Sequence, residues 1–292
     1  MRAVLVFATA LLVLADTLAF AGGVSAKREA VSSTNFSRPH DLILSPDGRL
    51  LFVTDMDNSQ IKELDPKSLK IVGAFGINEL SRPHDLVFGP DGLLYIADTA
   101  QDRIAIYKMT GAIASPVGQI AGLDGPEGLD FGSDGRLYVA NTSGGSVVVL
   151  DNGKIVGETS KAAGIGFIRP HDLDVDAKGQ VYVCDSGNDR IVILDANLKF
   201  LKEFKGPPYN FHEPKYIGFD DAGRLYVADE YSNQLKIFDA KHRPVLTIGD
   251  GEPGTEGGRL RKPEGVTVQG DQMWVSDTYN DRILRYRLSF DK

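Results

Sequence analysis

The chain has 292 residues, of which 42% are hydrophobic and 25% are charged, and its formal net charge is −8. This composition is typical of a soluble globular protein, and the length allows either one large domain or two average ones. The negative charge argues against a nucleic-acid partner, because an acidic surface and a polyanion repel each other unless a basic face is segregated.

The first residues have the pattern of a secretory signal peptide. Arg2 supplies a positive start, and residues 3–15 form an apolar stretch that is too short to cross a bilayer comfortably. Asp16 is unusual in such a segment, so an uncleaved anchor is the alternative. With a cleaved signal, the mature protein has no stable membrane insertion.

Small residues predict signal cleavage after Ala21 or after Ala26. We therefore expect a signal peptide over residues 1–26 and one domain over residues 27–292, in a secreted or periplasmic protein. Cys184 is the only cysteine, so no intramolecular disulfide can form, which fits a bacterial periplasm better than a disulfide-stapled extracellular module.

The remainder of the chain consists of six copies of one unit. The clearest copy runs over residues 169–194, and the others begin at Arg38, Arg82, Gly125, Glu213 and Lys262. Each copy contains a proline, a short apolar strand, a turn, a second strand such as LYVAD, a polar loop and a third strand such as RIVIL. Short apolar runs between turn signals are typical of β-strands.

Two markers keep the same register through all six copies. The residue after each repeat's proline is His40, His84, Glu127, His171, Lys215 and Glu264, with steps of 44, 43, 44, 44 and 49 residues. The residue that closes each second strand is Asp55, Asp98, Asn141, Asp185, Asp229 and Asp277, with steps of 43, 43, 44, 44 and 48 residues. Because two independent markers keep the same spacing, the repeat is not a chance coincidence.

A period in the forties with three or four strands per copy predicts an all-β, six-bladed β-propeller. One small sheet cannot bury both of its faces, whereas blades packed in a closed ring can. The last copy stops after its third strand, so we expect residues 27–35 to pair as the outer strand of blade six and fasten the ring. We expect a monomer.

The repeat pattern over residues 38–288 resembles the NHL repeat family, in which a PxG or PHD segment, a strand, an xDG turn, LYVAD and xxNxRI follow one another. The resemblance implies the propeller fold. It does not choose a function, because propellers of this kind serve both as enzymes and as binding platforms.

The innermost strand of each blade lines the central channel, so the residues after the prolines should form a ring at its entrance. Imidazoles with carboxylates beside them suit zinc or another divalent cation. Alternate blades two, four and six would supply His84, His171 and Glu264 as ligands, with Asp85 and Asp172 next to the histidines. The alternative is that these histidines are structural, each hydrogen-bonded to the adjacent aspartate or to a backbone carbonyl.

Arginines lie two positions before three of the ring residues, at Arg38, Arg82 and Arg169. They could form a cationic rim that binds a carboxylate or another small anion. The alternative is that they pair with acids of the neighbouring blades. The aspartates that close the second strands, together with Arg103, Arg190 and Arg282, are expected to be structural, accepting loop N–H groups and tying loops to strands.

The PHD segments also resemble those of the peptidyl-hydroxyglycine lyases, which are six-bladed NHL-type propellers. The resemblance implies a zinc ion held by histidines from alternate blades and a Ca²⁺-ligating aspartate beside the last PHD histidine; His84, His171, Asp85 and Asp172 match. Two departures are clear. Glu264 stands where a third histidine is expected, and the position of the family's catalytic arginine holds Ser186 or Thr278. Tyrosines match at Tyr231 and Tyr279.

Three functions remain open on these residues. The first is a binding propeller whose channel mouth holds a divalent cation and a small-molecule or peptide anion. The second is a metal-dependent lyase or hydrolase, with His40 or Tyr231 transferring the proton. The third is a metal-free scaffold that binds a protein partner.

Overall fold

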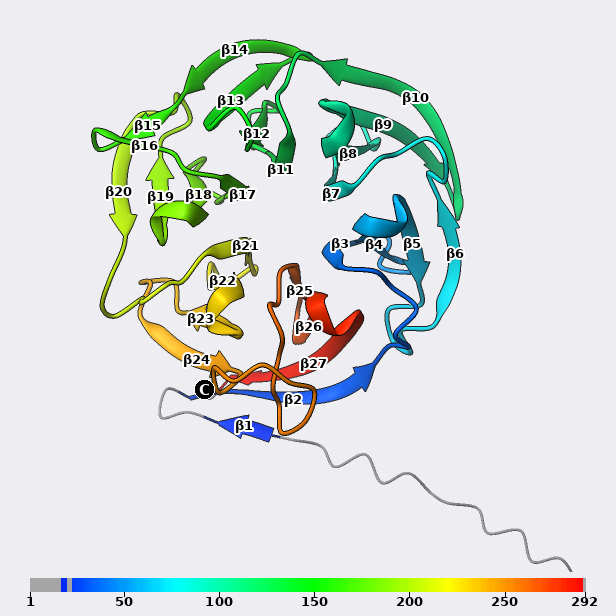
Figure 1. Ribbon diagram of the computed structural model, residues 1–292, viewed down its shortest axis with the longest axis vertical. Helices are drawn as coiled ribbons and strands as arrows, with labels where there is room; N and C mark the ends of the chain where they lie inside the picture. The colour runs from blue at the N-terminus through cyan, green and yellow to red at the C-terminus, as the bar shows by residue number, and fades with distance from the viewer. Residues whose placement is uncertain (1–16, 20–22, 291–292) are drawn as a thin grey trace, which may run out of the picture.

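The computed structural model describes residues 17–19 and 23–290, and it shows six small antiparallel sheets arranged in a ring around a central channel (Figure 1). The predicted all-β, six-bladed propeller is therefore confirmed. No helix in these described ranges is long and apolar enough to cross a membrane. The proposed signal segment falls largely outside the described residues.

Blades one to three each contain four strands, numbered from the channel outward. Blade one has β3 (Pro39–Leu44), β4 (Leu51–Asp55), β5 (Gln60–Leu64) and β6 (Ile71–Phe75). Blade two has β7 (Pro83–Phe88), β8 (Leu94–Asp98), β9 (Arg103–Thr110) and β10 (Ile113–Ala121). Blade three has β11 (Pro126–Phe131), β12 (Leu137–Asn141), β13 (Ser146–Asp151) and β14 (Lys154–Thr159).

Blades four and five repeat this plan. Blade four has β17 (Pro170–Val175), β18 (Val181–Asp185), β19 (Arg190–Leu194) and β20 (Phe200–Phe204), and it follows a small hairpin of β15 (Lys161–Ala162) and β16 (Ile165–Gly166). Blade five has β21 (Pro214–Phe219), β22 (Leu225–Asp229), β23 (Gln234–Phe238) and β24 (Pro244–Ile248).

Blade six is built from both ends of the chain. It has β25 (Val266–Gln269), β26 (Gln272–Asp277) and β27 (Arg282–Phe290), and its next strand is β2 (Val24–Val31), which pairs antiparallel with β27. A short strand, β1 (Thr17–Ala19), pairs with the outer edge of β2. The expectation that an N-terminal strand closes the ring is confirmed, and the strand begins three residues earlier than predicted.

The hydrophobic core lies between the blades rather than inside any one of them. Six clusters of buried side chains each join two neighbouring sheets. The cluster between blades six and one, for example, packs Trp274 and Ile283 against Leu42 and Leu51. Each blade therefore depends on both neighbours for the burial of its two faces, as the sequence indicated.

The aspartates that close the second strands are structural, as expected, and they act on the loop that precedes the inner strand of their own blade. In every blade a side-chain oxygen of this residue accepts the N–H of the residue two positions before the proline, at 2.6–2.8 Å. The second oxygen of Asp185 accepts from Nε of Arg190 at 2.7 Å, and both side chains are fully buried. These bonds hold each loop at the channel mouth.

We expect Asp185→Ala to destabilise the protein by about 3–5 kcal/mol, because it removes the fully buried carboxylate that binds Nε of Arg190 and leaves that guanidinium with Glu203 as its remaining carboxylate partner. Urea unfolding followed by circular dichroism measures the change. Asp47→Ala is the control, because Asp47 pairs with Arg49 on the surface, and this substitution should change stability little. Equal, small effects of both substitutions would contradict the structural role.

The position of β2 also bears on signal processing. Val24 and Ala26 are buried, and residues 24–26 pair with Phe290, Ser289 and Leu288. Cleavage after Ala26 would remove three residues of the closing strand, whereas cleavage after Ala21 leaves it whole. We expect the exported protein to begin at Gly22, as measured by intact mass after expression with export. A mature protein that begins at Lys27 and melts at the same temperature as one beginning at Gly22 would contradict this.

Candidate metal centre at the channel mouth

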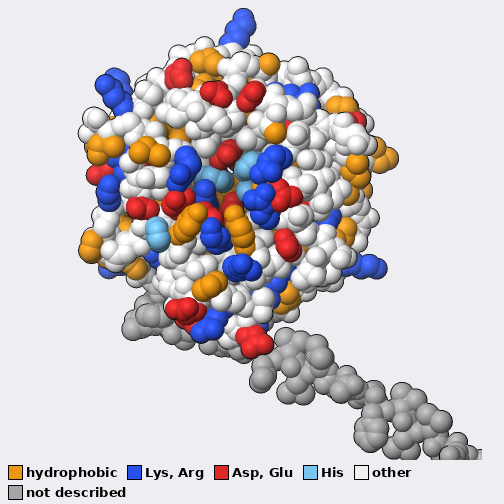
Figure 2. Space-filling model, in the orientation of Figure 1, with side chains coloured by type: hydrophobic (Ala, Val, Ile, Leu, Met, Phe, Trp, Pro, Cys, Tyr) orange, Lys and Arg blue, Asp and Glu red, His pale blue; other side chains and the backbone are white. Residues whose placement is uncertain are grey.

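The inner strands all begin at the same end of the channel, so the residues after the repeat prolines meet there. Five of these strands begin at the proline itself, because proline lacks the N–H that a longer ladder would need. The resulting ring contains His40, His84, Glu127, His171, Lys215 and Glu264. Figure 2 shows histidines at the centre of this face, surrounded by lysine, arginine and acidic side chains.

Three histidines of the ring converge. One ligand nitrogen from each of His40, His84 and His171 lies within 4.8 Å of the other two, and all three side chains are buried. The ring centroids of His40 and His84 are 4.7 Å apart, and that of His171 lies 6.0 Å from His84 and 6.3 Å from His40. Three convergent imidazoles with a free fourth position are the donor set of catalytic zinc sites.

The hydrogen bonds of two histidines select the tautomer that a metal requires. Nδ1 of His40 lies 3.0 Å from the carbonyl oxygen of Arg38, and Nδ1 of His84 lies 2.9 Å from that of Arg82. A carbonyl can only accept, so each Nδ1 carries the hydrogen and each Nε2 keeps its lone pair. This carbonyl–histidine arrangement orients metal-binding imidazoles in many proteins.

Burial keeps the imidazoles neutral. Desolvation lowers the pKa of His84 to about 4 and lowers the pKa values of His40 and His171 well below the usual range. The positive charge of Lys215 is the second cause for His171. Neutral imidazoles are the form that binds a cation, so no proton has to leave these rings near neutral pH.

Two glutamic acids flank the histidines. Oε2 of Glu264 lies 3.1 Å from Nε2 of His40, and Oε2 of Glu127 lies 3.2 Å from Nε2 of His171. Burial raises the pKa of Glu127 to about 7 and that of Glu264 to about 8. At these short distances a carboxylate oxygen and an imidazole lone pair repel each other unless a proton or a cation lies between them. A protonated glutamic acid that donates to Nε2 satisfies such a contact, and so does a cation bound by the imidazole.

The structure groups the predicted ligands differently from the sequence interpretation. The convergent set joins His40 to His84 and His171, whereas Glu264 contacts His40 from the side. His40 and His84 come from adjacent blades and His171 from blade four. The expectation that ligands come from alternate blades does not give this set, because a side chain as long as histidine can reach the channel axis from any blade.

Asp85 and Asp172 do not join the histidines. Each aspartate follows its histidine directly, and successive side chains of a strand point in different directions. Both carboxylates accept a backbone N–H group of the next blade. Asp85 accepts from Leu129 at 2.6 Å, and Asp172 accepts from Ile217 at 2.9 Å. Together with Asp41, they line a cavity of about 130 Å³ further along the channel. Burial raises the pKa of Asp85 to about 6.

Tyr216 separates the histidines from these aspartates. It is fully buried, its ring meets His171 edge-on at 5.1 Å, and its hydroxyl donates to the carbonyl oxygen of His84 at 2.9 Å. Because blade five lies opposite blade two, this side chain crosses the channel (Figure 1). In the sequence, Tyr216 stands at the position where the other copies have aspartate or glycine. The repeat pattern alone does not predict that its side chain contacts the histidines.

The three rim arginines are ion-paired with neighbouring acids. Arg38 and Arg82 share the carboxylate of Asp57, with nitrogen–oxygen distances of 2.6 and 3.1 Å, and Arg169 binds Glu213 at 2.6 Å. Arg82 and Arg169 are still about half exposed, at 47% and 53% of their side-chain surface. Both therefore keep donors directed to solvent at the mouth.

The backbone of this rim is left-handed in all six blades. The residue before each proline has a positive φ, and only blade three uses glycine there; the others are Arg38, Arg82, Arg169, Glu213 and Lys262, with φ of 47–53°. This conformation costs a side-chain-bearing residue roughly 1–2 kcal/mol. Long charged residues at strained positions around an opening are typical of a functional rim.

Tyr231 lies beside the mouth, in the turn at Glu230–Ser232, and is 45% exposed. The ammonium of Lys262 lies 3.7 Å from the centre of its ring and 4.9 Å from that of Tyr279. Ser186 and Thr278, the positions matched to the lyases' arginine, instead donate their hydroxyls to the proline carbonyls of the next blade, at 2.5 and 2.8 Å. They are therefore inter-blade contacts.

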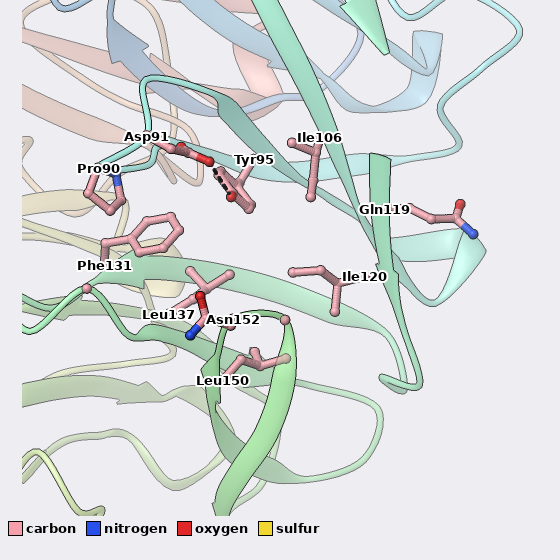
Figure 3. Close-up of a pocket in the computed structure, with 12 residues that line it drawn as sticks. Pro90, Asp91, Tyr95, Ile106, Gln119, Ile120, Phe131, Leu137, Leu150 and Asn152 are labelled. Carbon is pink, nitrogen blue, oxygen red and sulfur yellow. Dashed lines mark hydrogen bonds between the residues drawn. The ribbon is translucent and has the colours of Figure 1, made fainter. Parts of the chain in front are cut away.

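A larger hollow, of about 480 Å³, lies at the far ends of the strands between blades two and three (Figure 3). Apolar side chains such as Ile120 and Phe131 line it, and the hydroxyl of Tyr95 donates to Asp91 at 2.9 Å. The polar groups of its lining do not form a cluster of possible metal ligands or a nucleophile with its base. The candidate site is therefore the channel mouth.

Comparisons with known proteins agree with this architecture. The NHL repeat model matches residues 167–194, and the model "Strictosidine synthase-like, N-terminal" matches residues 118–148. Among curated proteins, none has a sequence that matches significantly.

Solved structures resemble the chain over most of its length. Virginiamycin B lyase from Staphylococcus aureus is 15% identical, with a TM-score of 0.62 over 90% of this chain and 99% of that one. An auxiliary nutrient binding protein from Bacteroides thetaiotaomicron is 14% identical, with a TM-score of 0.69 over 87% of this chain and 70% of that one. At these identities the likeness concerns the fold. With its six repeats and closed ring, the chain is a six-bladed β-propeller, and its segment 167–194 matches the NHL repeat.

Proposed function

We propose that this protein is an exported propeller whose channel mouth binds one divalent cation through His40, His84 and His171 and uses it to hold a small or peptidic anionic ligand. The convergence of three buried, neutral imidazole nitrogens within 4.8 Å supports the proposal most directly. Zinc fits best, because it prefers imidazole donors and accepts three protein ligands plus one exchangeable position. Calcium fits poorly, since it prefers oxygen ligands.

The rim supports the anionic ligand. The cations at the opening are Arg38, Arg82, Arg169, Lys215 and Lys262, and the acids there include Asp57, Glu213, Glu230 and the three aspartates that accept rim backbone N–H groups, Asp102, Asp189 and Asp281. Burial raises the pKa of Glu127 to about 7 and that of Glu264 to about 8, which reduces the negative charge of both side chains near neutral pH. The exposed donors of Arg82 and Arg169 and a bound cation would hold an anion on a protein whose net charge is −8.

A metal-dependent lyase or hydrolase is the second candidate, because three histidines leave a fourth position for a substrate oxygen or a water. A zinc ion there would polarise a carbonyl or lower the pKa of bound water. Tyr231 could transfer a proton from its turn beside the mouth, whereas His40 serves as a ligand in this arrangement. Propellers of this fold include both a lyase and nutrient-binding proteins, so the fold accommodates either class.

The first test is elemental analysis of the purified protein after dialysis against metal-free buffer. We expect about one zinc or other transition metal per chain, and its loss in the variant His84→Ala/His171→Ala. His212→Ala is the matched control, since His212 is exposed and lies outside the cluster. Circular dichroism shows that each variant is folded. A protein that neither retains nor takes up metal would contradict the metal centre and leave the protein-binding scaffold.

Single substitutions decide between the two ligand sets. We expect His40→Ala to weaken zinc binding by more than about 100-fold, the upper range for loss of an indirect partner. We expect Glu264→Gln to weaken it less, because the amide keeps the shape while His40 still binds. Competition with a chromophoric chelator measures both constants. The reverse order would restore Glu264 as the ligand and His40 as the flanking group.

Turnover separates binding from catalysis. The zinc-loaded protein would be incubated with a peptidyl-α-hydroxyglycine and with a simple ester, with His84→Ala/His171→Ala as the blank. Metal-dependent product would make the protein an enzyme. Zinc binding without product would favour the binding propeller.

A further inference from the structure

The ring residue of blade five differs in charge from all the others. Lys215 occupies the position that holds histidine or glutamic acid in the other blades, and its side chain is only 13% exposed. Its positive charge is among the causes that lower the pKa values of His40, His84 and His171. Lys215 therefore belongs to the same ring at the mouth as the histidines.

The neighbouring acids do not satisfy this ammonium. Nζ of Lys215 lies 3.5 Å from Glu230 and 3.9 Å from Glu213, and both distances exceed those of normal charge-assisted hydrogen bonds. Each acid is bound more closely by another cation. Glu213 contacts Arg169 at 2.6 Å, and Glu230 contacts Lys262 at 3.1 Å.

Lys215 is only loosely paired with these two acids, so its ammonium can donate to a further anion at the mouth. The histidines and Lys215 occupy equivalent positions in one ring of residues. A carboxylate has two oxygens, one for a cation and one for an ammonium. Tyr231, on the blade-five side of the mouth, is 45% exposed, although the ammonium of Lys262 lies 3.7 Å from the centre of its ring; its exposed part would contact the remainder of such a ligand.

We propose that Lys215 is the anchor for an organic carboxylate, which bridges its ammonium and the cation at His40, His84 and His171. This inference rests on the proposed metal centre. It assigns the decisive contact to Lys215, which belongs to the same ring of residues as the histidines, whereas the rim arginines lie two positions before that ring. The ligand class is a carboxylic acid with an adjacent apolar or peptidic group.

The test uses the full mature chain loaded with Co²⁺, whose visible absorption reports on its ligands. Hippurate, a carboxylate with an amide and a ring, would be titrated into the wild type, with acetate and inorganic phosphate as comparisons. We expect hippurate to bind one to one and more tightly than acetate or phosphate. Tighter binding of phosphate, or no binding of hippurate, would overturn the proposed ligand class.

The substitution Lys215→Met should weaken hippurate binding by at least about tenfold, because one charge-assisted contact is lost. One Co²⁺ per chain should remain, and Lys215→Arg should restore much of the affinity. Lys215→Gln is a second neutral variant in case the first does not fold. Lys154→Met is the control, because Lys154 is exposed on the outer strand β14. Unchanged hippurate affinity in the neutral variants would overturn the role of Lys215.

Failure of the metal centre is distinguishable from failure of this inference. If the wild type binds no Co²⁺, the proposed function is wrong, and calorimetry with the metal-free protein then tests Lys215 directly. Hippurate that binds the metal-free wild type and not the Lys215→Met variant would keep Lys215 as an anion site. Equal binding of hippurate by the metal-free wild type and the metal-free Lys215→Met variant would exclude Lys215 as an anion site.

Discussion

The pairing of β2 with β27 is the interaction on which the rest of the structure depends. Every blade exposes two apolar faces, and each of the six core clusters needs two blades. A ring without its closing strand would leave the last sheet short and the buried side chains of Leu284 and Leu288 partly uncovered. Closure therefore joins residues more than two hundred positions apart and makes the ring one cooperative unit.

Polar contacts between neighbouring blades fix the backbone at the channel mouth. The residue before the repeat proline donates its N–H to a side chain of the preceding blade in most blades, as Arg38 does to Asp281 at 2.9 Å and Lys262 to Asn233 at 3.0 Å. Hydroxyls such as that of Thr142 bind the next proline carbonyl, at 2.6 Å. The histidines thus project from a backbone held on both sides, which is the preorganisation that a metal or ligand site requires.

The channel holds two chemically different layers. Above Tyr216, neutral histidines and raised-pKa glutamic acids meet a ring of cations; beyond it, carboxylates accept backbone N–H groups across blades. The same PHD segment supplies both layers, because the histidine and the aspartate that follows it leave the strand in different directions. One three-residue motif therefore presents its histidine at the channel mouth and uses its aspartate to join neighbouring blades.

The sequence by itself determined the number of blades, the strands, the closure by an N-terminal strand and the ring of residues at the mouth. These follow from local patterns that repeat: apolar alternation, turn glycines and a constant register of proline and aspartate. The structural role of Asp185 and its equivalents could be predicted for the same reason.

Only the tertiary structure decided which ring residues meet. Register places six residues on one circle, but it does not say how far each side chain reaches or which way it leans, and so His40 joined His84 and His171 in place of Glu264. The tertiary structure also showed that Tyr216 crosses the channel to the carbonyl oxygen of His84 and that the ammonium of Lys215 lies 3.5 Å from its nearer acid, Glu230. The reason is physical: repeats fix positions along the chain, whereas distances across a channel depend on side-chain length, rotamer and the charges that face one another.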